Sequence, residues 1–295
     1  MKLPQPSNLR ISPILLLACI ALVAIPASLL ASAAAAQEIA GFGPLDPAPP
    51  TGLTPEQVIQ RFAARETEFR HARENYTFRQ MVRVDTVDED TNKVDGEYQQ
   101  VTDITFSPEG KREEHVVFAP ANTLQRVMMS PADMQDIEHR LPFILTTEDL
   151  PDYNVTYLGR QHVDELDTYV FSAAPKVIAK NRRYFQGKVW VDTQDFQIVL
   201  VNGKNVPDDV RRGHEDLSPP FTTYYEQVDG KYWFPTYTKA EGNLHFAAQQ
   251  GALSQDVHLR SIVKYTDYKQ FRSTATIVST GGVVNDPDKP AAPPK

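Results

Sequence analysis

Residues 257–271 read VHLRSIVKYTDYKQF, and this stretch decides the fold. Val257, Leu259, Val263 and Tyr265 fall on one parity of the run, while polar residues dominate the other. Successive side chains of a strand point to opposite faces, so the pattern predicts a strand with one covered face and one solvent-facing side. Antiparallel sheets commonly have this sidedness, and other elements must cover the apolar face.

The same alternation recurs along most of the chain, with turn-forming residues between the runs. The predicted strands cover residues 78–84, 98–106, 111–118, 153–160, 168–173, 184–192, 196–204, 221–228, 232–240 and 257–271. A sheet of so many strands must curl or close to protect its edges.

Two segments predict helices. Thr54, Pro55 and Gln57 form the cap, first-turn proline and capping box of a helix start. An apolar stripe then follows at near-heptad spacing on Val58, Phe62, Phe69 and Tyr76. A shorter helix begins after Ser130. The predicted fold class is therefore α+β, a curved antiparallel sheet, or incomplete β-barrel, wrapped around a few helices.

The first residues have the order of a secretory signal peptide. Lys2 and Arg10 precede an apolar run over residues 14–30, and small residues follow as far as Ala36. We expect a signal peptide over residues 1–36 and a soluble protein in the periplasm. Two alternatives stay open, namely lipidation at Cys19 and retention of the run as a membrane anchor.

The remaining sequence divides into three parts. Residues 37–53 form a Pro/Gly-rich linker, residues 54–272 form one half-barrel domain, and residues 273–295 form a disordered tail. The formal net charge of −8 argues against binding to nucleic acid. Cleavage of the signal peptide would remove the only cysteine, so disulfides are excluded, and we expect a monomer.

Two hairpins carry a family resemblance. Residues 187–199 read GKVWVDTQDFQIV, and residues 229–235 read DGKYWFP, before the strand over residues 260–268. These segments resemble the C-terminal strands of LolA-like periplasmic proteins, which include the outer-membrane lipoprotein carriers. The resemblance implies a half-barrel with an apolar cavity for acyl chains and a non-enzymatic role. An inserted loop over residues 207–220 departs from the pattern, and no functional residue of the family can be carried over.

Large apolar side chains on the predicted strands are the candidate cavity lining, since apolar ligand sites are mostly aromatic and aliphatic. The candidates are Phe78, Val82, Phe106, Phe118, Tyr157, Phe171, Trp190, Trp233 and Tyr265. Ordinary core packing is the alternative interpretation for each of them. The expected partners are acyl chains of lipid or lipoprotein, and the alternative is an envelope protein bound by a module without cargo.

Catalytic and metal signatures are weak. Ser261 and Lys264 match a serine-x-x-lysine pattern, but residues three apart on a strand point to opposite faces. His214 lies beside two carboxylates in a loop, where adjacent residues rarely converge on one ion. We therefore expect no enzyme activity, cofactor or metal. A hydrolase built from dispersed carboxylates remains a third hypothesis, and it predicts a buried acidic pair in a cleft.

Overall fold

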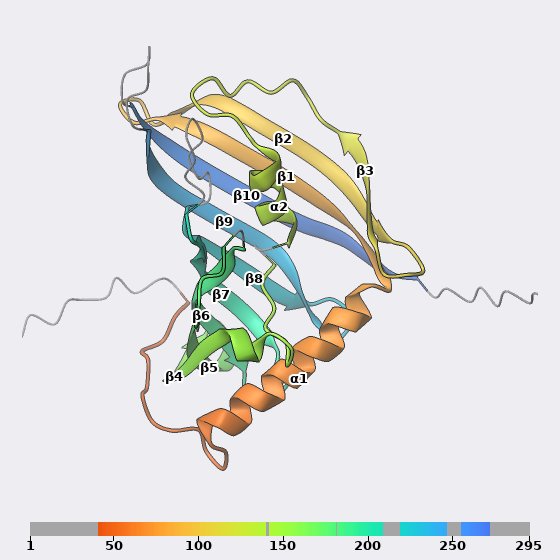
Figure 1. Cartoon of the computed structure of the whole chain (residues 1–295), viewed down its shortest axis with the longest axis vertical. Helices are drawn as coiled ribbons and strands as arrows, with labels where there is room; N and C mark the ends of the chain where they lie inside the picture. Colours follow the sequence, from red (N-terminus) through yellow and green to blue (C-terminus); the bar gives the residue numbers. More distant parts are fainter. Residues whose placement is uncertain (1–40, 140–141, 181, 209–218, 247–254, 272–295) are drawn as a thin grey trace, which may run out of the picture. The chain divides into compact units, whose positions relative to one another are not determined.

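The computed structural model describes residues 41–139, 142–180, 182–208, 219–246 and 255–271, all within the unit Ile39–Lys295. The predicted signal peptide with Cys19, the predicted tail 273–295 and the loop residues 209–218 lie outside the described residues. Within the described ranges there are ten strands and two α-helices (Figure 1).

Ten antiparallel strands form one curved, unclosed sheet in the order β3-β2-β1-β10-β9-β8-β7-β6-β5-β4 (Figure 1). The strands are β1 Tyr76–Asp88, β2 Lys93–Phe106, β3 Arg112–Phe118, β4 Tyr153–Val163, β5 Leu166–Pro175, β6 Tyr184–Asp192, β7 Ile198–Val206, β8 Phe221–Gln227, β9 Trp233–Phe246 and β10 Gln255–Gln270. The first and last of the described strands, β1 and β10, pair with each other, while β3 and β4 form the two edges. The predicted curved antiparallel sheet is confirmed in this form.

Strand β10 confirms the predicted sidedness. Val257, Leu259 and Val263 are 0% exposed and Tyr265 is 3% exposed. Lys264, on the other parity, is exposed. The covered parity joins the main apolar core, so this strand has one face against the interior and one towards solvent.

Helix α1 covers Pro55–Arg73 and begins where the sequence predicts. The Thr54 hydroxyl accepts a hydrogen bond from the Gln57 N–H at 3.2 Å, and the Gln57 side chain accepts one from the Thr54 N–H at 2.9 Å. Val58 and Phe62 are buried against the sheet. The helix ends earlier than the apolar stripe suggests, because Tyr76 is already the first residue of β1.

The second helix, α2, covers Pro131–His139 and also follows the prediction, and a short 3-10 turn, η1, covers Leu150–Asp152. Ser130 caps α2, since its hydroxyl accepts from the Asp133 N–H at 3.2 Å. None of the helices in the described ranges has the length and apolarity needed to cross a membrane.

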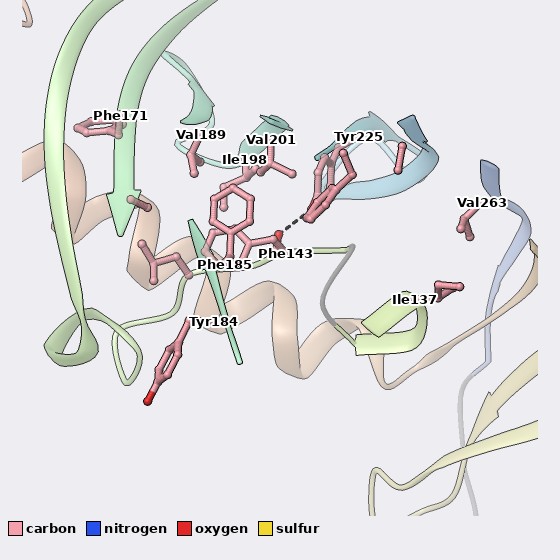
Figure 2. Packing of buried hydrophobic residues seen from close by; sticks show 14 of the residues in the cluster. Ile137, Phe143, Phe171, Tyr184, Phe185, Val189, Ile198, Val201, Tyr225 and Val263 are labelled. Carbon is pink, nitrogen blue, oxygen red and sulfur yellow. Dashed lines mark hydrogen bonds between the residues drawn. The ribbon is translucent and has the colours of Figure 1, made fainter. Parts of the chain in front are cut away.

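Both helices pack on the same face of the sheet and share one core. Val58 and Phe62 of α1 and Ile137 of α2 belong to the same buried cluster as side chains from the strands. Figure 2 shows the segment after α2 entering this core, where the Phe143 ring stacks on Phe185 with centroids 4.2 Å apart. Buried side chains therefore fill most of the space between the helices and the sheet.

A second, smaller cluster lies on the opposite face of the sheet. Val170 and Trp190 belong to it, while their strand neighbours belong to the main core. Phe42 covers Trp190 in an edge-to-face contact with centroids 5.8 Å apart. Phe42 also bridges to Val163 of β4, so the described part of the predicted linker is extended and lies along β4.

Candidate functional site

A cavity of about 200 Å³ lies where the end of α1 meets strands β1, β9 and β10. Its aromatic lining comes from α1, β1, β2, β9 and β10, and consists of Phe69, Tyr76, Phe78, Phe106, Phe234, Tyr265 and Tyr268. The cavity forms here because α1 stops at Arg73, so no helical turn continues over the first residues of β1. The described lining is thus mostly apolar and aromatic, as in many ligand pockets.

The aromatic rings pack against one another as a continuous wall. Tyr268 stacks on Phe78 with centroids 5.2 Å apart, and lies 4.7 Å from Phe234. Phe234 meets Phe69 of α1 edge to face at 5.1 Å. The Tyr268 hydroxyl donates to the Pro235 carbonyl at 2.7 Å, which fixes the ring at the centre of the wall. These contacts hold the aromatic lining in place.

Two arginines reach the same cavity. Arg73 ends α1, and Arg112 begins β3. Arg112 donates from Nε to Glu114 Oε1 at 2.6 Å and from Nη2 to Gln80 Oε1 at 3.0 Å. Arg73 makes neither a hydrogen bond nor an ion pair with any residue that the structure describes. Burial lowers the pKa of the Arg73 guanidinium, which nonetheless stays charged.

Buried polar groups without partners lie beside the arginines. Tyr265 and Gln80 sit at directly paired positions of β10 and β1, and each is 3% exposed. The Tyr265 hydroxyl and the Gln80 side-chain nitrogen have no hydrogen-bond partner among the described residues. Burial raises the pKa of Tyr265 to about 12, and the polar side chains of Thr238 and Gln80 beside the hydroxyl lower it in part. Leaving such groups unpaired has a free-energy cost.

The cavity brings together three of the nine side chains predicted to line it, Phe78, Phe106 and Tyr265. Four others, Val82, Tyr157, Phe171 and Trp233, belong to the main core or pack against it away from the cavity. The Trp233 indole N–H donates to Asp195 Oδ2 at 3.2 Å. Whether any of the nine contacts a ligand stays a prediction.

Two of the nine predicted residues, Phe118 and Trp190, do not lie on the face of the sheet that the helices cover or are not buried there. Phe118 is 51% exposed, because it ends β3 at the edge of the sheet, where no further strand covers it. Trp190 lies in the cluster on the face away from the helices, and its indole N–H donates to Gln161 Oε1 at 2.8 Å. The run around Trp190 is buried on both faces, so its apolar pattern could not indicate the face.

Sequence reasoning missed several lining residues, among them Arg73, Phe234 and Tyr268. Tyr268 lies on the parity opposite to Tyr265, yet both reach the cavity. The backbone at Asp267 has a φ of 57°, and the β1–β10 register shifts beside it. This irregularity brings both tyrosines to one face. The irregular backbone at Asp267 therefore explains why the alternation did not predict Tyr268 as a lining residue. The sequence has no clear signal for this irregularity.

The chemical groups at this site are suited to binding. In the described residues no three His, Cys, Asp or Glu side chains lie together in a way that could hold a metal ion. Ser261 is buried and Lys264 exposed, as expected for two faces of a strand. Glu74 is the one acidic residue among the described residues that line the cavity. The lining thus offers an apolar surface, two guanidinium groups and one carboxylate.

Comparisons with known proteins find only distant structural similarity. No family model matches the chain, and no curated protein matches it. One similar solved structure is described as an outer membrane lipoprotein-sorting protein domain from Vibrio parahaemolyticus, with 12% identity, a TM-score of 0.31, and coverage of 74% of this chain and 94% of that chain. Another is from the Pseudomonas aeruginosa MucA/MucB complex, with 8% identity, a TM-score of 0.19, and coverage of 71% and 100%. Both TM-scores are too low to assign a function to this chain.

Proposed function

We propose that this chain is a non-enzymatic binding protein of the periplasm that takes the apolar part of a lipid or an acylated cargo into its cavity. The proposal rests on one observation, the aromatic cavity at the end of α1. Apolar burial supplies the driving force, because it is favourable without requiring directional contacts. The export expected from residues 1–36 would place the protein among membrane lipids and lipoproteins.

The size of the cavity limits what it can take. Pockets that enclose a small ligand have volumes of about 300–1,000 Å³, whereas this cavity has about 200 Å³. Packed side chains fill most of the interior formed by the described residues. We therefore expect one end of an acyl chain to enter while the rest stays outside or lies on the protein surface. Each methylene group that enters contributes about 0.8 kcal/mol.

A chain-length series tests the proposal. Binding of butanoate, hexanoate, octanoate, decanoate and dodecanoate to the full chain would be measured by isothermal titration calorimetry. Affinity should rise about fourfold per added methylene, as expected from about 0.8 kcal/mol each, and then level off when the cavity is full. Phe78→Ser should weaken binding, because it removes part of the aromatic lining.

Phe118→Ser is the matched control. Phe118 is also a strand phenylalanine but is exposed and outside the cavity, so its loss should leave binding unchanged. Affinity that is independent of chain length, or no binding of any alkanoate, would contradict the proposed function.

A second candidate is an envelope interaction module without cargo. The observation that favours it is the edge strand β3, where Val116, Val117 and Phe118 are exposed. In the described part of the sheet β3 pairs with β2 alone, and a free edge can take a further strand. Val116→Lys would block a partner at this edge and leave alkanoate binding unchanged. A partner that crosslinks equally to Val116→Lys and to the natural chain would contradict this second function.

A further inference from the structure

Two polar side chains that line the cavity, and one beside them, have hydrogen-bond donors without acceptors. They are the guanidinium of Arg73, the side-chain nitrogen of Gln80 and the hydroxyl of Tyr265, and none finds a partner among the described residues. The orientation of the Gln80 amide follows from its neighbour. Arg112 can only donate, so the Gln80 oxygen faces Arg112 and the nitrogen is the unpaired end.

The cavity lining carries more positive than negative groups, although the chain as a whole is acidic. The chain has a formal net charge of −8, yet Arg73 and Arg112 both line the cavity and Glu74 supplies its one described carboxylate. Arg112 forms an ion pair with Glu114. Arg73 forms no ion pair with a described residue, and the carboxylates of Glu74 and Glu66 act on it only at longer range. Arg73 is half-buried, and partial burial of an unpaired cation has a free-energy cost, so an anionic ligand would be stabilised beside it.

We infer that the cavity binds an anionic amphiphile, with carboxylate or phosphate oxygens at Arg73 and Tyr265 and an apolar chain against the aromatic wall. The inference rests on the proposed function and names the class of ligand. An oxyanion has several lone pairs and no obligatory donor, so it satisfies a set of groups that mainly donate. Guanidinium groups bind such oxygens through short, charge-assisted hydrogen bonds.

The test compares three ligands with the same tail, decanoate, decyl phosphate and decanol, on the full chain. Both anions, or one of them, should bind at least about tenfold more tightly than decanol, as expected for one charge-assisted hydrogen bond. The preferred anion identifies the source of the head group, a free fatty acid or a phosphate ester. In Arg73→Gln this preference should disappear while decanol binding stays the same.

Arg70→Gln is the matched control, because Arg70 lies on the same helix but pairs with Glu148 Oε2 at 2.7 Å and does not line the cavity. It should keep the preference for anions. Equal binding of all three ligands by the natural chain overturns the inference and leaves the proposed function standing. The inference also fails if Arg73→Gln keeps the full preference. No binding of any ligand overturns the proposed function and the inference together.

A second pair of variants reports on the unpaired hydroxyl without any ligand. Tyr265→Phe removes a hydroxyl that has no partner, so the melting temperature should stay the same or rise, while the anion preference falls. Tyr225→Phe removes a hydroxyl that donates to the Phe143 carbonyl at 2.6 Å, seen in Figure 2, so the melting temperature should fall. Equal losses of stability in the two variants would show that the Tyr265 hydroxyl has an internal partner, which overturns the inference.

Discussion

The Glu66 carboxyl of α1 accepts a hydrogen bond from the backbone N–H of Ile198 in β7, with 3.0 Å between Oε1 and the nitrogen. Glu66 is 2% exposed, and burial raises its pKa from 4.5 to about 8. Between these two pH values the folded chain holds a proton that the unfolded chain has released. The free energy of unfolding should therefore fall as the pH rises through this window.

Glu66→Gln should remove this pH dependence, because the amide keeps an oxygen acceptor for Ile198 and cannot ionise. We expect the variant to be more stable than the natural chain at pH 8, on the order of a few kcal/mol, and nearly equal at pH 5. Urea unfolding at both pH values checks it. Parallel pH profiles for the two proteins would show that Glu66 ionises freely.

Phe171→Ala should lower the free energy of unfolding by about 3–5 kcal/mol. Phe171 is fully buried and its ring lies 5.4 Å from that of Phe62, so the change leaves a cavity between β5 and α1. Phe118→Ala, at an exposed position, should cost less than about 1 kcal/mol. Denaturant unfolding of both variants makes the comparison, and similar losses would contradict the location of the core.

Gly187→Ala should lower the melting temperature by several degrees, because β6 and β7 approach closely at this point. An added Cβ at Gly187 would lie 2.2 Å from the Asn202 carbonyl oxygen and 2.5 Å from the Gly203 Cα. Backbone has to move to admit it. Gly43→Ala is the control, since its added Cβ meets His162 at 3.4 Å, an ordinary contact. Calorimetric scans of the two variants should separate them clearly.

Phe42→Ala should expose Trp190 to water. Phe42 covers the Trp190 ring on the face away from the helices, and the chain has two tryptophans. In a Trp233→Phe background, Trp190 emission should shift to longer wavelength and acrylamide should quench it more strongly when Phe42 is also replaced. Unchanged quenching would mean that residues 41–53 do not stay along β4 in solution.

Thr54→Ala should destabilise the chain by about 1 kcal/mol, because it removes the oxygen that accepts from the Gln57 N–H. Thr54→Ser keeps this oxygen and should retain most of the stability. Urea unfolding of the two variants measures the capping contribution directly. Equal free energies of unfolding for Thr54→Ala and Thr54→Ser would show that the capping hydrogen bond does not stabilise the chain.

The sequence by itself determined the elements. The capping box at Thr54 and the alternation along residues 257–271 depend on neighbours close in the chain, so helix α1, most strands and the covered parity of β10 follow from local rules. The curved antiparallel plan follows too, because so many strands with one apolar face must bend around a cover.

Only the tertiary structure decided the site. The pairing of β1 with β10 joins the two ends of the described strands and brings Gln80 beside Tyr265. The irregularity at Asp267 turns Tyr268 to the same face, and the end of α1 at Arg73 leaves an unpaired guanidinium there. A period of two can separate two faces of a strand, but it cannot say which face is concave, where a bulge reverses parity, or which distant donors share a cavity.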